Sequence, residues 1–228
     1  MDKHFNIDHT PEYIHVTFDQ PFRVLSSAVL NGGLVEASHI VNLKVPKDLP
    51  GRDALGPPAA LIEQHCREKG LNGNSVGMMT AAAMDSMRTT QYRDQDVEIS
   101  AIVTAGISNL RRAGDKADFY AKGEQSPAPG TINTIVVCNV SLTRAAMVEV
   151  VMIAAEAKAA ALQNLALLSP VSNAAATGTG TDAIAIASVC SRLKIKYAGK
   201  HTRFGELLAK SVIESTTSSV MYARHQGK

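Results

Sequence analysis

An alanine-rich run from about Arg144 to Leu168 constrains the fold of this chain more than any other feature. Its spacing predicts one long amphipathic helix, capped by Ser141 or Thr143. The face expected to pack closely on a sheet holds small and apolar residues: Val148, Val151, Met152, Ala155, Ala159 and Leu162. The opposite flank carries a polar stripe with seven-residue spacing: Glu149, Glu156 and Gln163.

The first third of the chain alternates large and polar residues, a pattern typical of antiparallel strands. Residues 13–18 and 22–30 predict a hairpin, Asn31 to Gly33 a turn that accepts positive φ, and residues 35–45 a third strand. Further strands are expected at 97–107, 135–138 and 182–189. Loops are expected at 47–56 and 109–129.

Two further helices complete the pattern, one from Pro57 or Pro58 to Gly70 and one over residues 202–223. Strands in the first third and a long alanine-rich helix later predict an α+β fold with layers and a largely antiparallel sheet. The 228 residues do not require two cores, so residues 1–228 are expected to form a single domain.

Composition narrows the class of protein. Hydrophobic residues make up 45% of the chain and charged residues 19%, which excludes wholesale disorder. The net charge of +2 and the scattered basic residues do not favour nucleic acid as a partner. The start of the chain lacks the apolar core of a signal peptide, and no apolar run is long enough to cross a membrane. A cytoplasmic protein with no membrane partner is therefore expected.

Metal and disulfide sites are not indicated by the sequence. The three cysteines show no C-x-x-C spacing, and no H-E-x-x-H motif occurs. Cys138 and Cys190 lie in apolar runs and are expected to be buried as small hydrophobic residues.

The clearest candidate site is the loop from Thr177 to Asp182, which leads directly into an apolar strand. Its glycines allow a close approach to a ligand, its threonines supply hydroxyl groups, and Asp182 supplies one charge. Binding residues concentrate on loops held by a rigid scaffold, which favours a functional interpretation. The alternative is a solvated turn in which Asp182 bonds its own loop backbone.

Three other residues carry competing interpretations. Thr80 follows a glycine turn among small residues, where its hydroxyl could act on a substrate or bond the backbone. Lys200 and His201 lie near the start of the last helix, where a cation opposes the helix dipole. Capping therefore does not explain Lys200, although solvation would.

Six blocks in order carry a resemblance to a known family: residues 26–33, 76–80, 130–134, 156–162, 177–182 and 197–202. They resemble the adenosylcobinamide amidohydrolases over roughly residues 20–215. The resemblance implies hydrolysis of the amide that links aminopropanol to the corrin ring, giving adenosylcobyric acid in corrinoid salvage. The corrinoid would then be the substrate, and no cofactor is expected.

A more distant resemblance concerns the fold and the mechanism. The order of turns, strands and helix is similar to the self-processing aminopeptidase and ornithine acetyltransferase superfamily. That similarity implies a layered α/β/β/α sandwich with a Ser or Thr nucleophile, and the matching position is Thr80. A non-catalytic corrinoid-binding protein, or a peptidase or acyltransferase of this superfamily, is the alternative function. Assembly into a homo-oligomer is compatible with the sequence.

Amide hydrolysis needs an activated nucleophile, donors to the developing oxyanion and a proton for the departing amine. The candidates for catalysis are Thr80, Asp182 and His201, with a water activated by Asp182 or His201 as the alternative to Thr80. The candidates for substrate binding are Asn31, Gly32, Thr131, Asn133, Thr177, Thr179 and Lys200.

Overall fold

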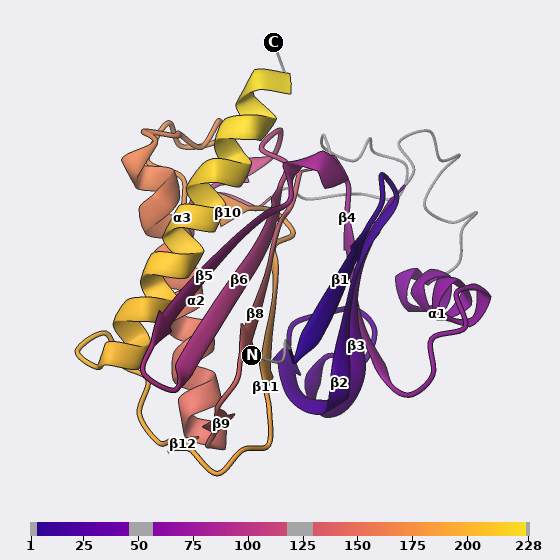
Figure 1. The fold of residues 1–228 in the computed structure, drawn as a ribbon. Helices are drawn as coiled ribbons and strands as arrows, with labels where there is room; N and C mark the ends of the chain where they lie inside the picture. Colours follow the sequence, from indigo (N-terminus) through magenta and orange to yellow (C-terminus); the bar gives the residue numbers. More distant parts are fainter. Residues whose placement is uncertain (1–3, 46–56, 118–129, 227–228) are drawn as a thin grey trace.

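The computed structural model describes residues 4–45, 57–117 and 130–226. The loop predicted at 47–56 and the later part of the connection predicted at 109–129 lie outside the described residues. The rest of the chain forms one large sheet with helices on its outer faces (Figure 1).

The large sheet has the strand order β4-β3-β2-β11-β8-β6-β5, and β1 pairs with β2. Its strands are β1 (Phe5–His9), β2 (Tyr13–Ser26), β3 (Gly33–Lys44), β4 (Ser75–Thr80), β5 (Arg88–Asp94), β6 (Val97–Ala105), β8 (Ile132–Cys138) and β11 (Ala183–Ser188). The β3/β4 and β8/β11 pairs are parallel, and the other pairs of this sheet are antiparallel. The expected, largely antiparallel sheet is confirmed. Two short pairs lie outside it: β7 (Leu110–Arg111) with β10 (Gly178–Thr179), and β9 (Ser141–Leu142) with β12 (Lys194–Ile195).

The sheet bends until its two halves face each other. Asn42 of β3 donates to the Thr104 hydroxyl of β6 at 3.0 Å, although β2, β11 and β8 separate these strands in the sheet order. Asn133 of β8 likewise donates to the Met79 carbonyl of β4 at 3.0 Å. A buried apolar core fills the space between the halves, with side chains from β2, β3, β4, β6, β8 and β11.

Helices cover the outer faces of both halves. α2 (Arg144–Asn164) and α3 (Arg203–Gln226) enclose a second core with β6, β8 and β11. α1 (Pro58–Glu68) packs Ile62 and Cys66 against Val41 of β3 on the other side of the molecule (Figure 1). A 3-10 turn, η2 (Met84–Ser86), precedes β5. The layers are therefore α/β/β/α, as the sequence resemblance implied, and the fold is α+β.

The predicted hairpin at 13–18 and 22–30 is wrong. Residues 13–26 form the single strand β2, and the break in the pattern is absorbed as a register irregularity between Thr17 and Phe22. The first half of β2 pairs with β1, and its second half pairs with β11. β2 thus belongs to both β layers.

The prediction of which face of α2 packs on the sheet is also wrong in part. Val148 and Met152 are 53% and 57% exposed. The buried residues of the helix are Ala146, Met147, Val150, Ile153, Ala154, Ala157, Lys158, Ala161 and Leu162. Alanines surround the whole helix, so the pattern offers two apolar faces and does not decide which one the sheet takes.

The ends of α2 follow local chemistry. Thr143 caps the helix by accepting from the Ala146 amide at 3.1 Å, as predicted. The helix stops at Asn164 and not at Leu168, because the chain turns at Ala166, whose φ is 50°. Cys138 is buried as expected, whereas the same expectation for Cys190 is wrong, since that residue is exposed beyond the end of β11.

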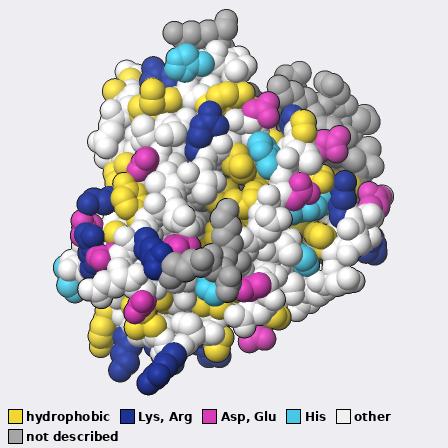
Figure 2. Space-filling model, viewed as in Figure 1, with side chains coloured by type: hydrophobic (Ala, Val, Ile, Leu, Met, Phe, Trp, Pro, Cys, Tyr) yellow, Lys and Arg dark blue, Asp and Glu magenta, His cyan; other side chains and the backbone are white. Residues whose placement is uncertain are grey.

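The surface agrees with the modest net charge. On the face seen in Figure 2, Lys and Arg side chains lie among Asp and Glu side chains without forming a stripe. Across the described segments, no helix combines the length and the apolar character that spanning a membrane requires.

Candidate functional site

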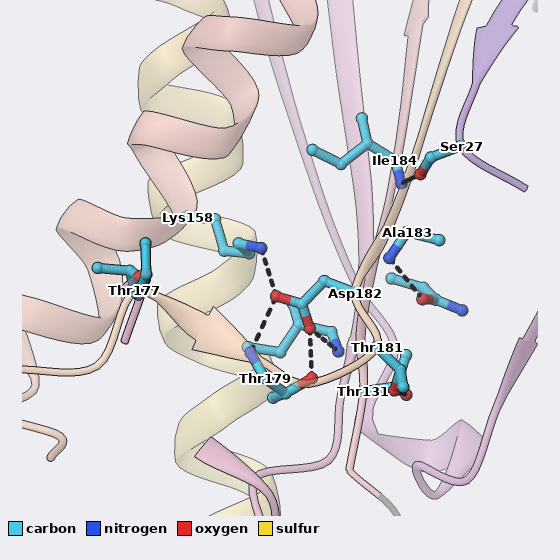
Figure 3. A network of polar contacts seen from close by, with 12 residues as sticks. Ser27, Thr131, Lys158, Thr177, Thr179, Thr181, Asp182, Ala183 and Ile184 are labelled. Carbon is cyan, nitrogen blue, oxygen red and sulfur yellow. Dashed lines mark hydrogen bonds and ion pairs between the residues drawn. The ribbon is translucent and has the colours of Figure 1, made fainter. Parts of the chain in front are cut away.

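The starts of β8 and β11 bring the predicted loop together with a second polar segment. These strands are parallel neighbours, and Asn133 is paired with Ala183. The residues that enter them therefore lie side by side: the loop from Thr177 to Asp182 next to Thr131 and Asn133. Figure 3 shows this junction with α2 beside it.

Asp182 is the centre of the junction, and four donors surround its carboxylate (Figure 3). Oδ1 accepts from the Ile132 amide at 2.9 Å and from the Thr179 hydroxyl at 2.5 Å. Oδ2 accepts from the Thr179 amide at 3.0 Å and from the Lys158 ammonium. A carboxylate offers about four lone-pair sites, so these donors occupy all of them. The geometry favours Asp182 as a charge partner over a proton acceptor.

Lys158 is the functional candidate that sequence reasoning missed. Its side chain and that of Asp182 are each only 10% exposed. Lys158 follows the exposed Glu156 by two residues, which is a rotation of about 200° round an α-helix. Its side chain therefore lies on the opposite side of the helix from Glu156, towards the sheet. A lone lysine inside an alanine-rich helix, together with a lone carboxylate at a strand entry, was the signal that could have found it.

A cavity of about 380 Å³ adjoins this ion pair. Leu25 of β2, Ile184 of β11 and the α2 residues Val148 and Val151 form its apolar lining. Its polar lining consists of Ser26, Ser27, Lys158 and Asp182. The exposed apolar face of α2, predicted to be buried, thus forms one wall of the cavity.

Thr131 and Asn133 point to the other face of the same strands, between the two β layers. The Asn133 amide donates to Asn42 at 2.8 Å and its oxygen accepts from the Ala183 amide at 3.2 Å. The Thr131 and Thr181 hydroxyls lie 2.6 Å apart. Buried amide side chains with several partners rigidify their surroundings, so Asn133 holds the β layers in register at the junction.

Thr177 lies at the outer end of the loop. Its hydroxyl accepts from the Ala113 amide at 2.9 Å, and its own amide donates to the Arg111 carbonyl at 2.9 Å. These bonds attach the loop to the end of β7 and to the segment that follows it. Both ends of the loop are therefore fixed, one by Thr177 and one by Asp182.

Thr80 is not brought to Asp182. It shares a strand face with Val76 and Met78, whose side chains lie in the core between the layers, whereas Asp182 faces α2. Thr80 is 2% exposed, and its hydroxyl accepts from the Ala82 amide at 3.0 Å. Thr80 therefore points into the core between the two β layers, whereas Asp182 points out of that core towards α2.

Lys200 and His201 lie on the far flank of α2. Lys200 forms an exposed ion pair with Glu156 at 2.5 Å, and Glu149 accepts from the Ala198 amide at 2.6 Å. The glutamate stripe thus holds the turn before α3. His201 is exposed in that turn. Among residues 4–45, 57–117 and 130–226, no three His, Cys, Asp or Glu side chains are grouped as metal ligands.

Asn31 and Gly32 shape the turn between β2 and β3. Asn31 has a φ of 52° and donates to the Ser75 carbonyl at 2.8 Å. A Cβ atom on Gly32 would lie 2.4 Å from the Ala28 carbonyl oxygen, so this position requires glycine. Both residues have a structural explanation, whatever they contribute to binding.

Comparison with known proteins gives a match over nearly the whole chain. A sequence model of a family described as adenosylcobinamide amidohydrolase matches residues 1–226. An adenosylcobinamide amidohydrolase of Methanosarcina mazei is 32% identical over 199 residues, covering 82% of this chain and 85% of that protein. An uncharacterized protein of Methanocaldococcus jannaschii is 28% identical over 243 residues, covering 96% and 93%.

Two solved structures align more weakly, each at 10% identity over 96% of this chain. The PH0078 protein from Pyrococcus horikoshii OT3 has a TM-score of 0.45, with 78% of it covered. An L-aminopeptidase D-Ala-esterase/amidase from Ochrobactrum anthropi has a TM-score of 0.39, with 82% covered. Both TM-scores are too low to support a statement about fold or mechanism.

Proposed function

Because the chain belongs to the adenosylcobinamide amidohydrolase family, we propose that it hydrolyses the amide joining aminopropanol to the corrin ring of adenosylcobinamide. The products are adenosylcobyric acid and aminopropanol, and the reaction serves corrinoid salvage. The match to the family over residues 1–226 carries this proposal. The chain is an amidohydrolase, which argues against a non-catalytic corrinoid-binding role.

The junction of β8 and β11 is the place on the described chain that suits such a reaction. Its loop is fixed at both ends, and its carboxylate and ammonium are paired beside a cavity. Charged groups held in place in a site that excludes water act strongly on a reacting carbonyl. These features support hydrolysis at this junction.

Attack on the amide carbon comes from a water molecule or from a side-chain hydroxyl. The position of Thr80 between the β layers, with its oxygen bonded to the Ala82 amide, favours water as the attacking group. Water adds to the carbonyl carbon, the carbon–nitrogen bond breaks, and the amine leaves with a proton. The new carboxyl group stays on the corrin.

Incubation of the purified chain with adenosylcobinamide tests the reaction. Chromatography should detect free aminopropanol and a corrinoid with one additional carboxyl group, in equal amounts and in proportion to the protein added. Heat-denatured protein is the control. Corrinoid that binds to the folded protein without any release of aminopropanol would refute the proposal.

A further inference from the structure

We propose that the cavity between α2, β2 and β11 receives the amide side arm of the corrinoid, and that Lys158 donates a hydrogen bond to its carbonyl oxygen. The ligand class is a secondary amide on a short aliphatic chain that ends in a hydroxyl group. This inference rests on the proposed function and assigns it a binding site and a catalytic residue.

Size is the first reason. Pockets for drug-sized ligands measure about 300–1,000 Å³, and this cavity of about 380 Å³ is near the lower limit. A corrin macrocycle with its peripheral amides is larger than a drug-sized ligand. A short arm can enter the cavity while the ring remains outside, against the exposed Val148 of its lining.

The lining matches the arm in polarity. Val151, Ile184 and Leu25 offer apolar contacts to methylene groups. Ser27 is exposed, and its hydroxyl oxygen accepts from the Ile184 amide at 3.1 Å. Within the described residues that hydroxyl donates to no acceptor, so its hydrogen is available to the arm.

Lys158 is placed to act on the carbonyl. An ammonium group carries three hydrogens, and within the described part of the chain Lys158 bonds a single acceptor, Asp182. The other hydrogens are available on the side of the cavity that Lys158 lines. Asp182 is itself fixed by Ile132 and Thr179, so the ammonium is held in place before substrate arrives.

The ammonium then stabilises the charge that develops during hydrolysis. When water adds to the carbonyl carbon, the electron pair of the carbonyl π bond moves to the oxygen. Lys158 donates to this oxyanion and keeps its own protons, because it is paired with a carboxylate and acts as a cation. When the carbon–nitrogen bond breaks, the oxyanion's electron pair re-forms the carbonyl and the bonding pair leaves on the nitrogen. The proton released by the attacking water goes to that nitrogen, so the amine departs neutral and the carboxyl product forms.

Val148→Phe tests the cavity without changing the ion pair. Val148 is 53% exposed, so the larger side chain is compatible with folding and narrows the mouth. We expect kcat/KM for adenosylcobinamide to fall about tenfold or more, mainly through KM. Val171→Phe is the matched control, since Val171 is 41% exposed and does not line the cavity, and it should leave kcat/KM unchanged.

Lys158→Met combined with Asp182→Asn tests the catalytic role while removing both charges together. If this double variant keeps the wild-type circular dichroism spectrum, kcat should fall about 10²–10³-fold with a smaller change in KM, as for loss of an oxyanion donor. If it does not fold, Lys158→Arg is the second variant, because it keeps a cation beside Asp182 but shifts the donor. It should lower kcat more than it changes KM, and a folded Lys158→Arg protein with wild-type kcat would overturn the role of Lys158.

The outcomes separate the two proposals. A wild-type protein that releases no aminopropanol refutes the proposed function, and the inference with it. An active wild type whose Val148→Phe variant keeps its kcat/KM overturns the cavity assignment alone. A folded double variant with wild-type kcat overturns the role of Lys158 alone.

Discussion

Two lysine–carboxylate ion pairs each have one partner on α2, and they show how burial determines the contribution of an ion pair to stability. Lys158 and Asp182 are each 10% exposed, whereas Lys200 and Glu156 are 70% and 51% exposed. Removing one partner of a buried pair leaves an uncompensated charge, but an exposed ion is resolvated by water. Asp182 was a candidate from its loop and Lys200 from its place near the start of the last helix. Lys158 was not singled out, because the periodicity of α2 did not reveal which face was buried.

Asp182→Asn should lower both stability and turnover. The NH2 group of asparagine would face groups that themselves donate hydrogen bonds, and the Lys158 ammonium would lose its negative partner. We therefore expect a loss of about 3–5 kcal/mol in the free energy of unfolding. Turnover of the folded fraction should fall about 10²-fold. Urea titration and the aminopropanol assay measure these effects.

Glu156→Gln is the control for this prediction. It removes the exposed pair with Lys200 on the same helix and should change stability by less than about 0.5 kcal/mol. An Asp182→Asn protein as stable and active as the wild type would show that the buried pair serves neither the fold nor the site.

Thr80→Ala should affect stability more than catalysis. It removes the acceptor of the buried Ala82 amide, a loss of about 1–3 kcal/mol, while kcat should stay within about tenfold of wild type. Thr80→Ser keeps the hydroxyl and should recover most of the stability. A folded Thr80→Ala protein whose kcat falls by several orders of magnitude, with Thr80→Ser active, would establish Thr80 as the nucleophile.

At the scale of elements, the sequence predicts what local periodicity determines. The three helices, the strand at β6 and the cap at Thr143 follow from spacing and capping chemistry. The hairpin failed because Asp19 to Pro21 resembles a turn, whereas pairing with neighbouring strands on both sides keeps β2 continuous. Such pairing involves distant residues and leaves no local pattern.

Besides its packing on β3, α1 contacts β2 through a pair of histidines that no sequence motif indicated. His65 of α1 and His15 of β2 place their Nε2 atoms 2.8 Å apart, and Tyr13 stacks on His15 with ring centroids 4.0 Å apart. Burial, and then the neighbouring His65, lower the pKa of His15 to about 4. Burial also lowers the pKa of His65. The pair therefore favours the neutral form.

This pair should make stability depend on pH in one direction. The pKa of His15 is 6.5 when unperturbed and about 4 in the fold, so the unfolded chain binds more protons between these values. Stability is fully present above pH 6.5 and should fall by about 3 kcal/mol as the pH drops to 4. Asp8 opposes this loss, whereas Lys69 and His39 add to it.

His15→Phe checks this prediction by urea titration at several pH values. Phenylalanine keeps the stacking on Tyr13 and removes the titrating group, so the loss of stability between pH 6.5 and 4 should shrink. His201→Phe changes an exposed histidine outside the pair and should keep the loss. A loss of the same size in both variants would assign the pH dependence to other groups.

At the scale of the whole molecule, the bend of the sheet is the feature that the residue pattern could not predict. Buried strands in both halves have the same composition whether the sheet is flat or folded over. The layers followed from the resemblance to a known superfamily, and the contacts of Asn42 with Thr104 and of Asn133 with Met79 now show how the halves are joined.

A single domain predicts a single unfolding transition. β2 pairs with strands of both layers, so neither layer should unfold while the other stays intact. Thermal melts followed by far-ultraviolet circular dichroism and by tyrosine absorbance should coincide. Two separated transitions would indicate that the layers are independent units.

Hydrolysis in heavy-oxygen water tests the proposed reaction most directly. The chain is incubated with adenosylcobinamide in this solvent, and the corrinoid product is analysed by mass spectrometry. Hydrolysis by this amidohydrolase predicts adenosylcobyric acid with one labelled oxygen atom in its new carboxyl group, together with unlabelled aminopropanol. Recovery of unchanged adenosylcobinamide, or of a product without the label, would contradict it.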